Sequence, residues 1–270
     1  MFREKRERLK GLSFNRMVPN ILTVLALCAG LTAIRFGFQE RWEAAIFALF
    51  VAAIFDGLDG RIARLMGATS EFGAMLDSLS DFLSFGVAPT ILLYFWTMQQ
   101  WGVVGWAFVL LYGVCCALRL ARFNTQDGDE GAPSWSYNFF VGVPSPAAAA
   151  LVLLPMMLSF VFGDDLLGHP IASAAVLFSV SILMISRVPT YSFKNFRVPN
   201  RYVLPTFLFV GLVAAFVASE YWATLSALTV LYLASIPLSM RSHAVLKRET
   251  ARLQAQDEDN GDNAGEEKPR

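Results

Sequence analysis

The chain has 270 residues, of which 55% are hydrophobic and only 16% are charged, whereas soluble domains carry about 25% charged residues. Its 22 basic residues balance its 22 acidic ones, so no overall positive field favours nucleic acid. Cys28, Cys115 and Cys116 lie in apolar runs without metal-site or disulfide spacing. The composition excludes an ordinary soluble domain and predicts an all-α polytopic membrane protein.

Apolar runs along the chain approach the length of about 20 residues that a membrane-spanning helix needs. They cover residues 19–38, 43–65, 72–97, 102–123, 141–162, 169–189, 202–218 and 221–240. The run at 202–218 is short, so six or seven spans are the alternatives to eight. We expect a transmembrane domain over residues 17–241.

The placement of the basic residues favours eight spans. An even number of spans puts both termini on one side, and 20 of the 22 basic residues then lie on that side, with only Arg35 and Arg41 opposite. Cytoplasmic loops carry an excess of Lys and Arg. Both termini are therefore predicted to face the cytoplasm.

Two segments are expected outside the bilayer. Residues 1–16 combine six cations with apolar side chains, which favours an amphipathic helix on anionic lipid. The alternative is a basic anchor without structure that only sets the orientation. Residues 242–270 form a cytoplasmic tail that is polar and acidic from about residue 249, and we expect it to be largely disordered.

Four aspartates lie inside predicted spans, where ionisable side chains are costly and indicate function. Asp56 and Asp59 belong to the second run, Asp77 and Asp81 to the third, and each pair shares one helix face. At about 1.5 Å per residue, Asp59 and Asp77 lie about 10 Å from the intervening turn, and Asp56 and Asp81 about 15 Å. Antiparallel packing would thus gather four carboxylates below the cytoplasmic surface.

Converging carboxylates need a neutralising partner. An all-oxygen set favours Mg²⁺ or Mn²⁺ over zinc, and paired metals commonly serve displacement at phosphorus. Pairing with arginine, or protonation within a proton pathway, is the alternative. Gly60 and Gly73 allow close approach of a neighbouring helix or a phosphate, and the Arg64 guanidinium suits a pyrophosphate.

The segment that begins at Asp56 resembles the signature of the CDP-alcohol phosphatidyltransferase family, D-x2-D-G-x2-A-R-x8-G-x3-D-x3-D. Its fixed positions are all filled, by Asp56, Asp59, Gly60, Ala63, Arg64, Gly73, Asp77 and Asp81. The resemblance implies a helical membrane enzyme with a six-helix catalytic core. It also implies a homodimer.

The resemblance further implies roles for the signature residues. Asp56, Asp59 and Asp77 would ligate two divalent cations, Mg or Mn, and Asp81 would complete the ligand set of the second cation and act as the general base. The CDP-alcohol would be held by Gly60, Arg64, Ser70 and the segment Pro19, Asn20, Ile21 and Leu22.

Within the family, SDFLSFGVAP (80–89), ALRLARFN (117–124) and FFVGVPSPAAAA (139–150) are similar to membrane-integral bacterial phosphatidylserine synthases. This likeness implies transfer of the phosphatidyl group of CDP-diacylglycerol to L-serine, with release of CMP, at the cytoplasmic face of a bacterial inner membrane.

Arg119 and Arg122 end the fourth run, where a guanidinium suits the carboxylate of serine. Anchoring by the positive-inside rule is the alternative for each. Two other functions remain open: the same chemistry on glycerol 3-phosphate or inositol phosphate, and transport of a divalent cation or proton through the same carboxylates. Transporters often contain inverted repeats, and none is evident here.

Overall fold

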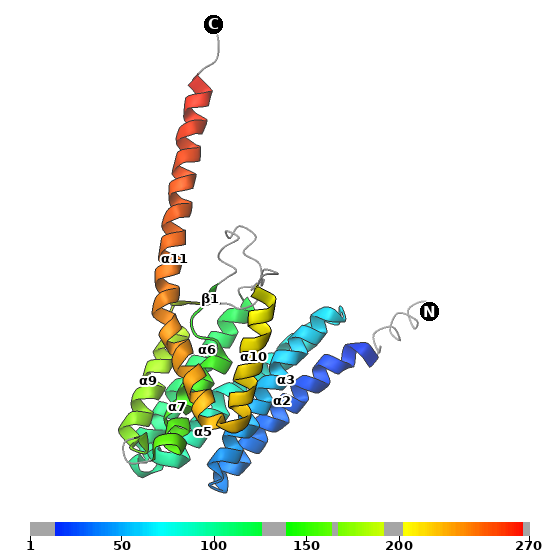
Figure 1. The fold of residues 1–270 in the computed structure, drawn as a ribbon, viewed down its shortest axis with the longest axis vertical. Coiled ribbons are helices and arrows are strands. Elements are labelled where there is room, and N and C mark those ends of the chain that lie inside the picture. The colour runs from blue at the N-terminus through cyan, green and yellow to red at the C-terminus, as the bar shows by residue number, and fades with distance from the viewer. Residues whose placement is uncertain (1–13, 126–138, 164–166, 192–201, 267–270) are drawn as a thin grey trace.

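The computed structural model describes residues 14–125, 139–163, 167–191 and 202–266, which form a helical bundle with one long projecting helix (Figure 1). The α-helices are α2 (Phe14–Phe38), α3 (Trp42–Leu65), α4 (Glu71–Asp81), α5 (Ala88–Leu93), α6 (Val103–Thr125), α7 (Ser145–Phe162), α9 (Pro170–Ile185), α10 (Val203–Ser219) and α11 (Tyr221–Glu266). The π-helical turn η1 (Phe82–Val87) joins α4 to α5, and a second π-helical turn, η2 (Tyr94–Met98), and the 3-10 turn η3 (Gln99–Trp101) continue the same segment after α5.

Within the described residues, five helical segments are long and apolar enough to cross a membrane: Met17–Phe38, Glu71–Trp101, Val103–Thr125, Ser145–Phe162 and Tyr221–Leu246. The apolar helices α9 and α10 are shorter, and α3 carries the charged residues of the signature. The predicted all-α membrane fold is confirmed. The start of α2 and the end of α11 lie toward the same end of the bundle (Figure 1), as an even number of crossings requires; the count of eight stays a prediction.

The core lies between α5, α6, α7 and α9, where large side chains such as Leu92, Tyr112, Met156 and Leu177 are fully buried. By contrast, α10 buries none of its residues, and its exposed surface is apolar. Such a surface matches lipid, because membrane helices associate through packing rather than through hydrophobic burial alone.

A small antiparallel sheet joins two connections at the end of the bundle from which α11 projects. Strand β1 (Phe139–Val141) pairs with β2 (Pro189–Tyr191), with Phe140 opposite Thr190. The sheet packs against α11, so it ties the loops after α6 and α9 to the last helix.

The C-terminal segment differs from the sequence prediction. Helix α11 continues to Glu266, whereas the composition predicted disorder from about residue 249. The stretch LKRETARLQAQ (246–256) consists mostly of strong helix formers. It extends a helix that already exists in the bundle, so no new nucleus is needed. The predicted amphipathic segment lies almost wholly outside the described residues, because these begin at Phe14.

Gly30 sets how closely α2 approaches the segment after α4. A Cβ built at Gly30 would lie 2.5 Å from Ser84 Oγ and 3.1 Å from Ser84 Cα. Replacing Gly30 by alanine therefore requires a shift of backbone, and overpacking of this kind costs about 1–3 kcal/mol. We expect Gly30→Ala to lower the melting temperature of the purified protein in detergent.

The matched control is Gly113→Ala in α6, where a Cβ would meet nothing within 4 Å. Alanine there gains helix propensity without a clash, so the melting temperature is expected to stay or to rise. Equal melting temperatures for the two variants would contradict the close approach at Gly30.

Candidate active site

The turn between α3 and α4 sets the relative position of the two acidic pairs. Gly67 has a φ of +58°, a conformation that glycine adopts at little cost. Ser70 then caps α4, because its Oγ accepts a hydrogen bond of 3.0 Å from the Gly73 amide. With the turn closed in this way, α4 runs back along the bundle beside α2.

Three carboxylates from the two helices meet. One carboxylate oxygen from each of Asp56, Asp77 and Asp81 lies within 4.8 Å of the others, and all three side chains are half-buried. The antiparallel placement expected from the spacing therefore brings these three predicted ligands together.

Asp59 faces α2 instead. It is only 4% exposed, and its Oδ2 accepts a hydrogen bond of 2.5 Å from Thr23 Oγ1. Asp59 and Asp77 nevertheless border the same cavity. The fourth predicted ligand thus lies beside the three-carboxylate group, held by a hydroxyl that the sequence analysis did not single out.

The donor set fits a divalent cation. Asp81 Oδ1 is buried and has no hydrogen-bond partner among the described residues, and an unsatisfied buried oxygen of this kind is costly. A cation held between Asp56, Asp77 and Asp81 would satisfy it and would offset the repulsion between the carboxylates. Carboxylate oxygens alone suit Mg²⁺ or Mn²⁺.

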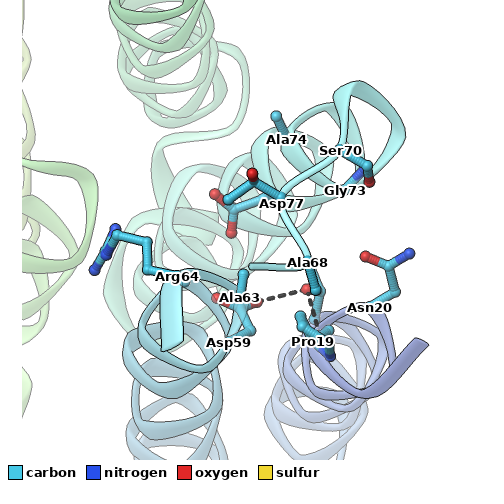
Figure 2. A pocket seen from close by; sticks show the side chains of 13 residues that line it. Pro19, Asn20, Asp59, Ala63, Arg64, Ala68, Ser70, Gly73, Ala74 and Asp77 are labelled. Atoms are coloured by element: carbon cyan, nitrogen blue, oxygen red, sulfur yellow. Dashed lines mark hydrogen bonds between the residues drawn. The ribbon is translucent and has the colours of Figure 1, made fainter. Parts of the chain in front are cut away.

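A cavity of about 220 Å³ opens next to these carboxylates, between α2, α3 and α4 (Figure 2). Its lining comprises Pro19, Asn20, Thr23, Asp59, Gly60, Ala63, Arg64, Ala68, Thr69, Ser70, Gly73, Ala74 and Asp77. Five of the residues expected to hold the CDP-alcohol are among them; the other two, Ile21 and Leu22, do not line the cavity.

Steric crowding explains why the signature has a glycine, Gly73, at this position of α4. A Cβ at Gly73 would lie 3.0 Å from Asn20 Oδ1 and 3.1 Å from Ser70 Oγ, so a larger residue would push the Asn20 amide aside. On the other side of the cavity, Arg64 is exposed and extends away from Asn20 (Figure 2). The two polar side chains therefore flank the cavity from different helices.

The two predicted acceptor arginines have different surroundings. Arg119 is 9% exposed, and its Nη1 donates a hydrogen bond of 2.6 Å to Ser145 Oγ. Its Nε is buried without a hydrogen-bond partner in the described part of the chain. Arg122 instead donates to the carbonyls of Ile185, at 3.0 Å, and Val141, at 3.3 Å, so it ties the end of α6 to β1 and α9.

Sequence reasoning missed Thr23 and Ser145. Thr23 lies four residues after Pro19, on the same face of α2, and this spacing was a usable signal. Ser145 stands between Pro144 and Pro146 at the start of α7, and only the fold reveals that it meets Arg119.

Comparison with known families bears on the same residues. The CDP-alcohol phosphatidyltransferase model matches residues 16–186, which contain the three carboxylates and the cavity. The chain belongs to the CDP-alcohol phosphatidyltransferase family. A second model, CDP-alcohol phosphatidyltransferase 2, matches residues 201–237. The resemblance drawn from the aspartate signature is confirmed.

Several bacterial relatives share most of the chain, and each carries the name CDP-diacylglycerol–serine O-phosphatidyltransferase. The protein of Mycobacterium leprae is 40% identical over 230 residues, 84% of this chain and 75% of its own length. That of Mycobacterium tuberculosis is 37% identical over 227 residues, with coverages of 84% and 79%. The Helicobacter pylori protein is 34% identical over 199 residues, with coverages of 73% and 81%.

The hydrogen bond from Thr23 to Asp59 generates a prediction. Thr23→Val keeps the shape of the side chain but leaves the buried Asp59 carboxylate without this donor. Loss of a group that orients a metal ligand typically weakens metal binding about 10- to 100-fold. We expect the dissociation constant for Mn²⁺, measured by electron paramagnetic resonance on purified protein, to rise about tenfold.

Thr32→Val is the matched control, because Thr32 lies on the same helix and donates to the carbonyl of Cys28. It is expected to bind Mn²⁺ like the unmodified protein. Unchanged Mn²⁺ binding in Thr23→Val would show that the hydrogen bond from Thr23 to Asp59 does not contribute to metal affinity.

Proposed function

We propose that this protein transfers the phosphatidyl group of CDP-diacylglycerol to the hydroxyl of L-serine, forming phosphatidylserine and releasing CMP. Three aspartates that converge from two helices beside a cavity carry this proposal, because a possible cation-binding set adjoins a cavity lined by residues expected to hold the CDP-alcohol. The names of the relatives support serine as the acceptor.

The acidic cluster supplies the charge balance for attack at phosphorus. Two divalent cations, Mg or Mn, held by Asp56, Asp59, Asp77 and Asp81 would draw negative charge from the pyrophosphate and from the departing CMP. The carboxylates fix where that charge is received, so the protein contributes positioning and electrostatic stabilisation. Asn20, Ser70 and the Gly73 backbone border the space for the nucleotide, and Arg64 is available to its phosphates.

The acceptor would bind on the other side of the cluster, between Asp81 and Arg119. These two residues lie close enough to interact electrostatically, and each has a buried side-chain atom without a hydrogen-bond partner within the described residues. Arg119 Nε would bind the carboxylate of serine, while Asp81 accepts the proton of its hydroxyl as that oxygen attacks phosphorus.

We further propose a homodimer in a bacterial cytoplasmic membrane, with the carboxylates toward the cytoplasm. The excess of basic residues on the side where the predicted spans place both termini supports this orientation. The acyl chains would stay in the bilayer while the headgroup reacts at the cytoplasmic end of the helices.

CMP release by the purified protein in detergent tests the reaction. CDP-diacylglycerol and Mn²⁺ or Mg²⁺ are combined in parallel with L-serine, glycerol 3-phosphate, inositol phosphate or no acceptor. We expect serine alone to stimulate release, a chelator to abolish it, and the lipid product to carry serine.

Stimulation by a phosphorylated acceptor instead would keep the metal site and overturn the serine assignment. Absence of release with every acceptor, from folded protein that binds Mn²⁺, would favour cation transport. Uptake of Mn²⁺ into liposomes without CMP formation would then be the confirming observation.

Arg119 gives a prediction specific to the acceptor. Arg119→Gln removes the guanidinium while Ser145 keeps a polar neighbour, so the carboxylate of serine loses a charged hydrogen bond worth about 1.5–3 kcal/mol. The KM for serine is expected to rise at least about tenfold, with little change in the KM for CDP-diacylglycerol.

Arg122→Gln is the comparison, because Arg122 donates to backbone carbonyls. We expect it to lower the melting temperature and to leave the KM for serine near the unmodified value. A larger rise in this KM for Arg122→Gln than for Arg119→Gln would move the acceptor site to Arg122.

A further inference from the structure

The helix that carries Asp77 and Asp81 changes its winding directly after Asp81. Residues Phe82–Val87 form the π-helical turn η1, and the Ala88 amide donates to the Leu83 carbonyl, five residues back, rather than four. A π-helical turn inserts one extra residue, which offsets the side chains on its two sides by about 100°. The direction of Asp81 relative to the lower part of this helix therefore depends on η1.

Pro89 explains why the turn is wide at this point. In an α-helix, residue 89 would donate its amide to the carbonyl of Phe85, but proline has no amide hydrogen, and its ring collides with that carbonyl. Insertion of a π-helical turn relieves such a collision. Pro89 therefore cannot supply the amide that the Phe85 carbonyl would receive in an α-helix, and within a membrane an unsatisfied backbone group costs several kcal/mol.

The neighbouring helix α6 supplies the missing donor. Tyr112 Oη donates a hydrogen bond of 3.1 Å to the carbonyl of Phe85, and Tyr112 is fully buried. One turn further along α6, Cys116 packs on the same turn so closely that a Cβ at Gly86 would lie 3.0 Å from its Sγ. A tyrosine hydroxyl from α6 thus replaces the amide that Pro89 lacks.

Helix α2 also contacts this turn. Ser84 Oγ donates to the carbonyl of Ala26 at 3.4 Å, and Gly30 leaves the room for Ser84 described above. The turn after Asp81 is therefore held from two helices, from α2 through Ser84 and from α6 through Tyr112.

We propose that Tyr112 is a positioning residue for the metal site: its hydrogen bond to Phe85 holds the π-helical turn that directs Asp81 toward Asp56 and Asp77. Tyr112 touches none of the reacting groups in this scheme. It acts through the backbone, four residues beyond Asp81. The inference rests on the proposed function in so far as Asp81 is a metal ligand and the base.

Tyr112→Phe tests this role, because it removes only the hydroxyl and keeps the buried ring. We expect the dissociation constant for Mn²⁺, measured by electron paramagnetic resonance, to rise about tenfold, as for other groups that orient metal ligands. The kcat for serine-dependent CMP release is expected to fall by a similar factor, while the KM for serine changes little.

Tyr94→Phe is the matched control. Tyr94 lies in the second π-helical turn, η2, of the same continuous helix, where its ring packs against Phe95 and Trp106. It makes the same chemical change 13 residues from Asp81, so Mn²⁺ binding and kcat are expected to match the unmodified protein.

Pro89→Ala provides a second, independent readout. Alanine restores an amide that can donate to the Phe85 carbonyl, so the hydroxyl of Tyr112 should matter less. We expect the loss of Mn²⁺ affinity caused by Tyr112→Phe to shrink at least threefold when Pro89→Ala is present, a coupling that a double-mutant cycle measures. If Tyr112→Phe alone is not obtained folded, recovery of folded protein in the double variant supports the same link.

Normal Mn²⁺ affinity and kcat in folded Tyr112→Phe would overturn the proposal, and so would equal losses with and without Pro89→Ala. Neither result depends on the acceptor, because Mn²⁺ binding is measured without substrate. Failure of the proposed function would appear separately, as an unmodified protein that binds Mn²⁺ but does not respond to serine.

Discussion

The constraint on which the site depends is the cost of placing carboxylates among membrane helices. Asp56, Asp77 and Asp81 bring their oxygens within 4.8 Å of one another, which mutual repulsion and desolvation oppose. Side chains on the surrounding helices offset part of this cost through hydrogen bonds and electrostatic interactions. Thr23 on α2 donates to Asp59, and Arg119 on α6 is close enough to Asp81 to interact with it electrostatically. A divalent cation bound to the three carboxylates would complete the balance.

A second constraint acts on the backbone of the same helices. Within a bilayer every amide and carbonyl needs a partner from the protein, and Pro89 removes one amide from the helix that carries Asp81. The Tyr112 hydroxyl supplies the replacement, and Thr90 Oγ1 donates back to the carbonyls of Gly86 and Val87. Side chains that satisfy the backbone are thereby linked to the geometry of the carboxylates.

The two constraints assign separate tasks to the helices around the site. Helices α3 and α4 carry the acidic residues, and α2 closes the cavity through Asn20 and orients Asp59 through Thr23. Helix α6 contributes Arg119 to the proposed acceptor side and Tyr112 to the backbone of η1. Helix α9 packs against α6, and α7 packs against α9, so α6 has the fixed position that both contacts require.

Much of this was available from the sequence alone. Apolar length determined the membrane class, and spacings of three and four residues placed each aspartate pair on one helix face, because helical periodicity is a local property. The order of the fixed residues from Asp56 to Asp81 also identified the family. The extension of α11 to Glu266 was not predicted, because polar composition says little about a helix that is already nucleated.

Only the tertiary structure decided which side chains meet across helices. It separated Arg119, buried against Ser145, from Arg122, bound to two carbonyls, although both occupy similar places in the sequence. It also paired Thr23 with Asp59 and Tyr112 with Phe85, residues 36 and 27 positions apart. The sequence determined where helices form and which side chains share a helix face, because helix propensity and periodicity act within a segment. Which side chains of different helices contact one another depends on how the helices pack, and no local sequence pattern encodes that packing.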